Sequence, residues 1–397
     1  MLKQDILREA TRLTQAGQLV EATALIQRML HGDNAPGAKS RITDRIAVGE
    51  PSVIDAKVHT VEDSSQPSPA KSARPRRLRE PLDRIRESVG LGFRCAIKRA
   101  PLSTEDIVPK EARFIEENYS NPAGSRSYKL FIPSGYHGQP LPLVIMLHGC
   151  TQSPDDFAAG TRMNFMAEEQ TCFVAYPAQR SDANPAKCWN WFRSSDQRRG
   201  EGEPSLIAGI TRKVMRDYCV DRARIYVGGM SAGAAAAAVM GATYTDLYAA
   251  IGLHSGLACG AAVDLPSAFV AMRQGRGADH PVISGDEDFV PTIVFHGDRD
   301  TTVHPKNGDQ ILEQARRTAG SHKKVHRGKI PGGHSYTRTV YSDADGRGNL
   351  EHWNIHGAGH AWSGGSPVGS YTDPQGPDAT REMLRFFLEH SIPRKRD

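Results

Sequence analysis

The stretch 224–234, "RIYVGGMSAGA", contains the pattern that decides the fold. The apolar run Ile225–Val227 predicts a buried strand, and the alanine-rich run that begins at Ala232 predicts a helix. Between them lies the pattern G-x-S-x-G, which predicts a sharp turn with Ser231 at its tip. Such a turn needs small neighbours, and Gly229, Ala232 and Gly233 provide them. Ser231 is therefore the candidate nucleophile.

The rest of the chain from about Glu111 onward alternates short apolar runs with longer helical patterns. Strands are expected at 128–133, 141–149, 172–177, 224–229, 248–256 and 292–297. Helices are expected at 156–170, 204–218, 231–244 and 308–320. This alternation predicts an α/β fold with a mostly parallel central sheet and helices on both faces. Ligands of such sheets bind at the carboxyl ends of the strands.

The region before this alternation has a different character. Residues 1–31 have the apolar spacing of two short amphipathic helices. Residues 32–110 are polar and rich in proline without periodicity, which predicts a largely disordered linker. We therefore expect a catalytic domain at 111–397, preceded by a helical segment more typical of docking than of catalysis.

Composition narrows the classes of function. The chain of 397 residues carries 50 basic and 45 acidic side chains, and this net charge of +5 is too small to indicate a nucleic-acid partner. No run of apolar residues is long enough for a transmembrane segment, and the N-terminus lacks the apolar core of a secretory signal. We therefore expect a cytoplasmic protein.

The six cysteines show no C-x-x-C spacing, which argues against a zinc or thioredoxin-type site. We expect them to be reduced and mostly buried. For Cys150 two roles stay open: a packed small side chain, or a disulfide partner of a cysteine such as Cys188. No metal ion or organic cofactor is expected.

A serine nucleophile needs a general base and a carboxylate that orients it. In folds with this turn the acid follows the serine in the chain and the histidine follows the acid. The loop after the expected strand 292–297 contains Asp298 and Asp300. We favour Asp300, which lies deeper in the loop, and expect Asp298 to stabilise the turn through its own backbone.

The stretch 353–365, "WNIHGAGHAWSGG", contains the favoured base, His360. Its glycines form a loop after a strand-like run, and such a loop can present the imidazole to the serine. His356 is expected at the end of that strand, and His334 in "PGGHSY" is the second candidate base. The other histidines downstream of the acid are less well placed: His304, His322, His326, His352 and His390.

The run 144–150, "VIMLHGC", predicts a buried strand that ends in a loop suited to binding a negatively charged oxygen. We expect the backbone N–H groups of Cys150 and Ala232 to stabilise this oxyanion, and losing one such donor costs on the order of 3 kcal/mol. Trp362, Trp189 and Trp191 are expected to line the substrate pocket. For Trp189 and Trp191 a role in the core is an equal alternative.

From about Arg113 onward the chain resembles the polyhydroxybutyrate (PHB) depolymerase-type esterases of the α/β-hydrolase superfamily, a group that includes feruloyl and acetylxylan esterases. The similar stretches are "LVIMLHGCTQSPDDFA", "CFVAYPAQ", "CWNWF", "RIYVGGMSAGAAAA", "IVFHGDRDTTV" and "GAGHAWSGG". The resemblance implies a triad of Ser231, Asp300 and His360, with Cys150 and Ala232 at the oxyanion site. It does not extend to the first 110 residues.

The resemblance implies a serine esterase without a cofactor that acts on polyhydroxyalkanoate or its oligomers. The N-terminal helices would then touch the surface of the polyester granule. One alternative is an esterase for feruloyl or acetylxylan esters from plants. Another, from a different class, is a non-catalytic protein that binds the granule surface.

Overall fold

The computed structural model describes residues 102–275, 290–316 and 322–393. The expected N-terminal helices and most of the expected linker lie outside these residues. The segment 102–110, also expected to be linker, packs on the domain. Ser103 caps the short 3-10 helix η1 (Thr104–Asp106), Ile107 is buried, and the Ile107 carbonyl accepts a hydrogen bond of 2.9 Å from Asn164 Nδ2. The packed domain thus begins upstream of residue 111.

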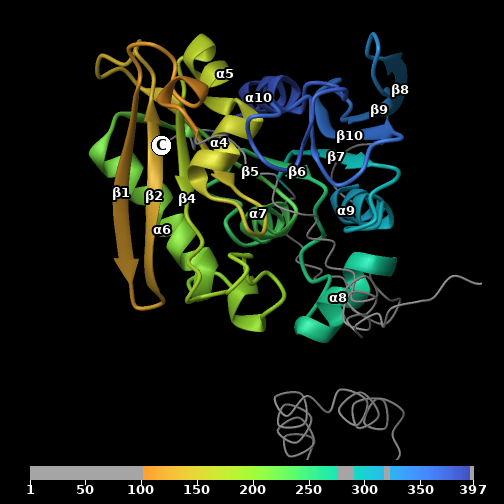
Figure 1. Cartoon of the computed structure of the whole chain (residues 1–397), viewed down its shortest axis with the longest axis horizontal. Helices are drawn as coiled ribbons and strands as arrows, with labels where there is room; N and C mark the ends of the chain where they lie inside the picture. Colours follow the sequence, from red (N-terminus) through yellow and green to blue (C-terminus); the bar gives the residue numbers. More distant parts are fainter. Residues whose placement is uncertain (1–101, 276–289, 317–321, 394–397) are drawn as a thin grey trace, which may run out of the picture. The chain divides into compact units, whose positions relative to one another are not determined.

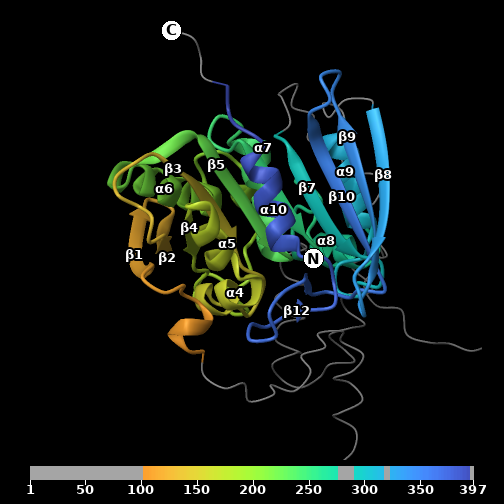
Figure 2. The same ribbon diagram turned by 90° about the horizontal axis from the view of Figure 1, so that it is seen from above.

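One sheet of ten strands forms the centre of the domain, in the order β1-β2-β4-β3-β5-β6-β7-β10-β9-β8. The strands are β1 (Arg113–Asn121), β2 (Gly124–Ile132), β3 (Leu141–Leu147), β4 (Phe173–Pro177), β5 (Val220–Met230), β6 (Ala250–His254), β7 (Thr292–Gly297), β8 (His322–Lys329), β9 (Ser335–Ser342) and β10 (Gly348–His356). In Figure 2 the sheet runs from β1 at one side of the domain to β8 at the other.

The strands from β4 to β10 in this order pair in parallel, and the pairs at both edges are antiparallel. This arrangement confirms the mostly parallel sheet, and each expected strand is present. The sequence patterns did not reveal β1, β8 or β9. Strand β8 is exposed along almost its whole length and has the sequence "HKKVHRGK", so no apolar face marks it.

Helices cover both faces of the sheet (Figure 1). One face packs against α6 (Gly202–Asp217), α7 (Ala232–Thr243), α8 (Leu265–Gln274) and α9 (Lys306–Ala315). The other face packs against α4 (Pro154–Thr161), α5 (Met163–Gln170) and α10 (Ala379–Leu388). The single helix expected at 156–170 is broken into α4 and α5 at Arg162, which adopts a left-handed conformation with φ 57°. A second 3-10 helix, η2, spans Ser194–Gln197.

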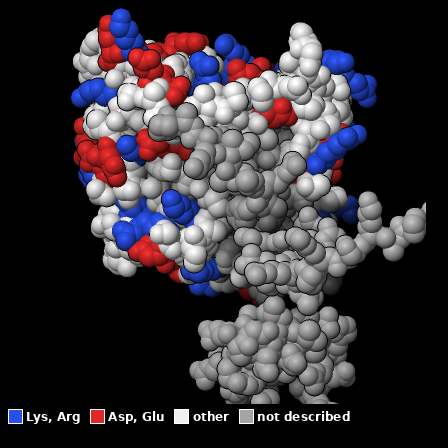
Figure 3. Space-filling view, in the orientation of Figure 1, with Lys and Arg blue, Asp and Glu red and all other residues white. Residues whose placement is uncertain are grey.

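Short strands β11 (Trp362–Ser363) and β12 (Thr372–Asp373) pair in parallel next to the expected base, His360. Within the described part of the chain, no helix combines the length and apolar character needed to cross a bilayer. On the described part of the face in Figure 3, acidic and basic side chains are intermingled. That mixture agrees with the small net charge of the sequence.

Candidate active site

Ser231 occupies the sharp turn between β5 and α7. Its backbone has φ 56° and ψ −121°, a strained conformation for a residue with a side chain. A Cβ on Gly233 would lie 2.0 Å from the Leu147 carbonyl oxygen, and one on Gly229 would lie 2.5 Å from the same atom. Both glycines of G-x-S-x-G are therefore required because β3 passes directly behind the turn. This geometry matches the expected presentation of Ser231.

Asp300 and His360 meet as expected for an acid and the base that it orients. His360 Nδ1 lies 2.7 Å from Asp300 Oδ2, and the backbone N–H groups of Thr302 and Val303 donate to Asp300 Oδ1 at 2.9 and 2.8 Å. Burial alone would raise the pKa of Asp300, but its interactions with His360, His296 and the Val303 N–H outweigh burial, so the net pKa is lowered. Asp300 is thus an acceptor at neutral pH, and the His360 proton is placed on Nδ1.

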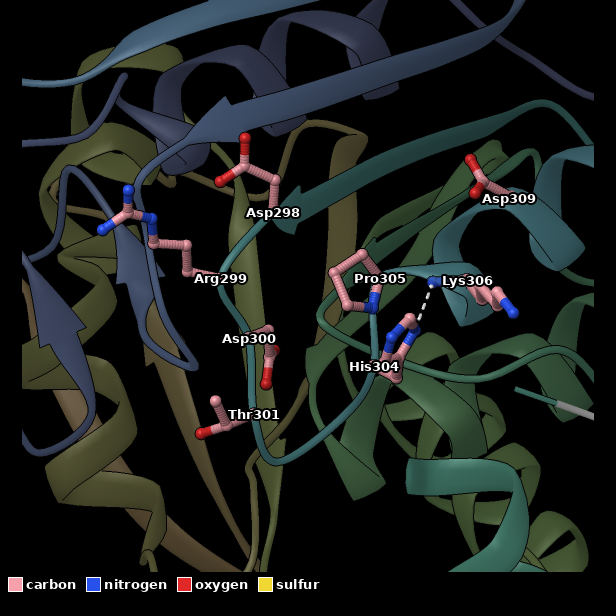
Figure 4. Close-up of a pocket in the computed structure, with 8 residues that line it drawn as sticks. All are labelled: Asp298, Arg299, Asp300, Thr301, His304, Pro305, Lys306 and Asp309. Carbon is pink, nitrogen blue, oxygen red and sulfur yellow. Dashed lines mark hydrogen bonds between the residues drawn. The ribbon is translucent and has the colours of Figure 1, made fainter. Parts of the chain in front are cut away.

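Asp298 and the two other candidate histidines are engaged elsewhere. Asp298 Oδ2 lies 2.9 Å from His356 Nδ1, and Asp298 Oδ1 accepts a 2.7 Å hydrogen bond from the Gly357 N–H. Figure 4 shows Asp298 and Asp300 pointing in different directions from the loop after β7. Asp298 therefore supports the neighbouring loop rather than only its own turn. His334 Nε2 lies 2.8 Å from Asp373 Oδ2.

An open pocket of about 790 Å³ lies beside this loop (Figure 4). Its lining comes from the loop after β7 and the start of α9: Asp298, Arg299, Asp300, Thr301, His304, Pro305, Lys306 and Asp309. Neither Ser231 nor His360 lines it. We therefore do not assign this pocket to the reacting ester.

His254, at the end of β6, connects the serine turn to the loop of the base. Its carbonyl accepts a 2.9 Å hydrogen bond from the Ser231 N–H, and its ring Nε2 accepts one of 3.0 Å from the Ser363 N–H. The ring also stacks on Trp362 at a centroid distance of 4.9 Å. Burial lowers the pKa of His254 to about 3, so the ring is neutral and able to accept. The sequence reasoning missed this residue, although it lies at the carboxyl end of an expected strand.

The loop after β3 lies beside the nucleophile. A Cβ on Gly149 would be 3.6 Å from Ser231 Cβ. The neighbouring N–H groups of Cys150 and Ala232 have no acceptor among the described residues, which leaves both available to a ligand. This arrangement is consistent with the expected oxyanion site.

Cys150 forms a disulfide with Cys188, 38 residues away in the chain. The expectation of reduced cysteines is therefore wrong for this pair, and of the two roles considered for Cys150 the structure shows the disulfide. The sequence could not decide between them because spacing alone does not reveal which thiols meet. Cys172 and Cys259 are free and buried as expected, whereas Cys219 is free and exposed.

The three tryptophans expected in the substrate pocket are core residues. Trp189, Trp191 and Trp362 are only 0%, 6% and 1% exposed. The Trp362 indole N–H donates to Thr380 Oγ1 at 2.9 Å, and its ring packs edge-on against Phe157. Trp362 therefore supports the loop of His360 from within and presents almost no surface to a substrate. For Trp189 and Trp191, the burial agrees with the core alternative.

Comparison with known proteins places the chain among esterases. A family model described as esterase PHB depolymerase matches residues 126–327. Poly(3-hydroxyalkanoate) depolymerase C of Paucimonas lemoignei is 33% identical over 262 residues, which cover 63% of this chain and 60% of that protein. Feruloyl esterase B of Neurospora crassa is 27% identical over 285 residues, which cover 68% of this chain and 89% of that protein.

A probable acetylxylan esterase A of Neosartorya fischeri is 27% identical over 210 residues, covering 49% of this chain and 56% of that protein. This chain therefore spans less than two thirds of the length of the Paucimonas depolymerase and of this acetylxylan esterase. Among solved structures, an acetyl xylan esterase from Aspergillus awamori superposes with a TM-score of 0.53 at 18% identity, covering 70% of this chain and 99% of that one. The fold is that of the α/β hydrolases.

Proposed function

Because the chain belongs to the esterase PHB depolymerase family, we propose that it hydrolyses carboxylic esters with Ser231 as the nucleophile, His360 as the base and Asp300 as the orienting acid. The observation that carries this proposal is the 2.7 Å contact between His360 Nδ1 and the buried Asp300. The loop that carries His360 is also hydrogen-bonded, through Ser363, to His254 next to the strained turn of Ser231. His254 links the two parts, because its carbonyl accepts from the Ser231 N–H and its ring accepts from the Ser363 N–H on the loop of His360.

The proposed reaction proceeds through an acyl-enzyme. Ser231 Oγ attacks the ester carbonyl while His360 Nε2 takes the hydroxyl proton, and the Cys150 and Ala232 N–H groups bind the oxygen as it becomes negative. The C–O bond to the alcohol then breaks, and His360 returns the proton to the leaving oxygen. Water repeats the sequence on the acyl-enzyme and releases the acid. Asp300 stabilises the imidazolium at both stages.

For the substrate we propose polyhydroxyalkanoate or its short oligomers, supported by the 33% identity to the Paucimonas depolymerase. A feruloyl or acetylated plant ester is the second candidate. It is favoured by a specific observation: the match to the Neurospora feruloyl esterase covers 89% of that protein, against 60% of the depolymerase.

The test is hydrolysis by the full chain of a p-nitrophenyl acyl series, a 3-hydroxybutyrate oligomer and methyl ferulate. The Ser231→Ala variant is measured beside it, with His326→Gln on the exposed strand β8 as a surface control. We expect Ser231→Ala to lose several orders of magnitude and His326→Gln to match the wild type. The preferred ester then separates the two substrate classes. A wild type inert on every ester would favour a non-catalytic binding protein.

Two further parts of this proposal concern the whole chain. Docking of residues 1–31 on a polyester granule predicts that Leu25→Glu with Ile26→Glu weakens co-sedimentation with granules and leaves hydrolysis of soluble esters unchanged. For the location of the protein, we propose the cytoplasm as the first candidate. The Cys150–Cys188 disulfide favours an oxidising compartment instead, because such bonds are typical of those compartments. Cell fractionation decides this point.

A further inference from the structure

The loop that carries Cys150 contains two consecutive peptide groups with four polar atoms, and three of these are bound by side chains. The His148 carbonyl accepts a 3.1 Å hydrogen bond from the Trp189 indole N–H. The Gly149 N–H donates to Gln152 Oε1 at 2.9 Å. The Gly149 carbonyl lies 2.7 Å from His148 Nδ1 and also accepts a longer hydrogen bond, 3.4 Å, from the Gln152 backbone N–H. The fourth atom, the Cys150 N–H, has no acceptor among the described residues.

The partners of His148 determine where its proton lies. The Gln179 backbone N–H donates to His148 Nε2 at 3.0 Å, so Nε2 carries no proton. Burial lowers the pKa of His148 to about 4, so the ring is neutral at ordinary pH. The one ring proton is therefore on Nδ1, and the contact with the Gly149 carbonyl is a hydrogen bond donated by the ring.

This hydrogen bond is the shorter of the two at the Gly149 carbonyl, and it therefore has the larger part in setting the direction of the next N–H. A trans peptide group is planar, so its C=O and N–H bonds point in opposite directions. A Gly149 carbonyl held toward the imidazole therefore turns the Cys150 N–H away from the imidazole. On the proposed function, that N–H has to point at the oxygen of an ester bound at Ser231.

We infer that His148 is a positioning residue for ester hydrolysis, which sets the direction of the Cys150 N–H through its hydrogen bond to the Gly149 carbonyl. It does not contact the substrate. Its role differs from that of His360, and it rests on the proposed function because it acts on the oxyanion donor of that reaction.

A buried polar cluster behind the loop holds His148 in place. The side-chain amide of Gln179 donates to Glu203 and to the Cys188 carbonyl, the latter at 2.9 Å. Glu203 is buried and also accepts from the Asn190 backbone N–H at 2.7 Å. Gln179 thus presents its backbone N–H to the imidazole from a constrained position. The same cluster supports the Cys188 end of the disulfide to Cys150.

Two substitutions at His148 separate its two hydrogen bonds. In His148→Asn the amide can reach the place of Nδ1 and keep the donor to the Gly149 carbonyl. In His148→Gln the amide can reach the place of Nε2 and keep the acceptor for the Gln179 N–H, but the donor to Gly149 is lost. Both variants have similar polarity, so the pair is matched. The exposed His326→Gln is the control for the substitution itself.

The measurements are kcat and KM on a p-nitrophenyl ester, with inhibition by a trifluoromethyl ketone, whose adduct with the serine carries the oxyanion. Removing a whole oxyanion donor costs roughly 10²- to 10³-fold in kcat. A misdirected donor is expected to cost less, roughly tenfold to a hundredfold. We therefore expect His148→Gln to lower kcat by that factor, to weaken the inhibitor equally and to leave KM within about threefold. His148→Asn should recover most of the loss.

Equal kinetics in His148→Gln and the wild type would overturn the inference. So would equal losses of kcat in both variants, because the retained donor would then make no difference. If neither variant folds, nitrogen-15 NMR of the imidazoles of the wild type tests the same hydrogen bond. A neutral His148 ring with its proton on Nδ1 supports the inference, and a proton on Nε2 contradicts it. Failure of the proposed function has another signature, a wild type no more active than Ser231→Ala.

Discussion

The serine turn and the oxyanion loop lie side by side, yet they are held in different ways. The turn depends on its own backbone: Ser231 is strained and the two glycines of its pattern fit against β3. The loop at Gly149 and Cys150 depends on the nearby Gln152 side chain, on the backbone N–H of Gln179 and the indole of Trp189 from distant segments, and on a disulfide. A local arrangement is visible as a short motif, whereas an arrangement built from distant partners is not.

The largest effect on kcat is expected from the acid that orients His360, because the reaction at both regions depends on this base. Asp300→Asn should lower kcat by about 10⁴-fold, because the amide no longer holds the catalytic tautomer of His360. Asp298→Asn is the matched control, since this carboxylate contacts His356 and Gly357 instead. Steady-state kinetics on a p-nitrophenyl ester measure both. Equal losses in the two variants would show that the acid is wrongly assigned.

The next largest effect is expected on stability, from replacing a glycine of the serine turn. Gly233→Ala places a Cβ against the Leu147 and His148 backbone oxygens, which cannot move without shifting β3. We expect a loss of several kcal/mol in the free energy of unfolding, or no folded protein. Gly135→Ala is the control, because a Cβ there meets only Thr171 side-chain atoms at ordinary contact distance, 3.4 Å. Thermal unfolding distinguishes them, and a Gly233→Ala protein as stable as the control would refute the close approach.

Histidines with lowered folded pKa values should make stability depend on pH, and they include His148 and His254 in these regions and His296 and His352 elsewhere in the domain. His148 and His254 have folded pKa values lowered to about 4 and about 3, below the value of 6.5 that they have without burial. As pH falls below about 6.5, the unfolded chain binds protons that the folded chain does not, so stability decreases toward about pH 4. The expected loss is on the order of several kcal/mol.

Urea unfolding of the full chain at pH 7 and at pH 4.5 measures this loss. The lowered pKa of Asp300 adds a further loss only as pH falls through its acidic range, because the folded state favours the ionised form. A free energy of unfolding that stays constant between the two pH values would contradict the neutral state of these histidines.

The smallest effect is expected from the covalent link of the oxyanion loop. Cys188→Ser opens the disulfide and should lower the free energy of unfolding by about 2–4 kcal/mol, with a moderate decrease in kcat. Cys172→Ser serves as a comparison for losing a buried thiol outside the loop. Peptide mapping without reductant should recover the linked Cys150 and Cys188 peptides. Their recovery as separate free thiols would show that the loop is held by hydrogen bonds alone.

Much of the fold could be predicted because it follows from local patterns. The parallel strands are apolar runs bounded by turn residues, and β5 with α7 carries the serine motif. Strand β8 could not be predicted because its residues are exposed and polar. Of the site, the contact between Asp300 and His360 agrees with the prediction.

The support of the site could not be predicted, since it depends on contacts between distant segments. His254 meets Ser363 across 109 residues, and Trp189 meets His148 across 41. The position of Trp362, two residues after His360, led to a wrong prediction. It suggested a residue that lines the substrate pocket, but the ring is buried against Phe157 and His254. An aromatic residue near a catalytic loop can equally support that loop from the core.

Labelling with a fluorophosphonate tests the central claim most directly, because this probe forms a covalent bond with an activated serine. Peptide mapping by mass spectrometry then locates the adduct in the full chain. We predict one adduct, on Ser231, formed together with loss of esterase activity and strongly slowed in Asp300→Asn. An adduct on a different serine, or complete inactivation with Ser231 unmodified, would contradict the account.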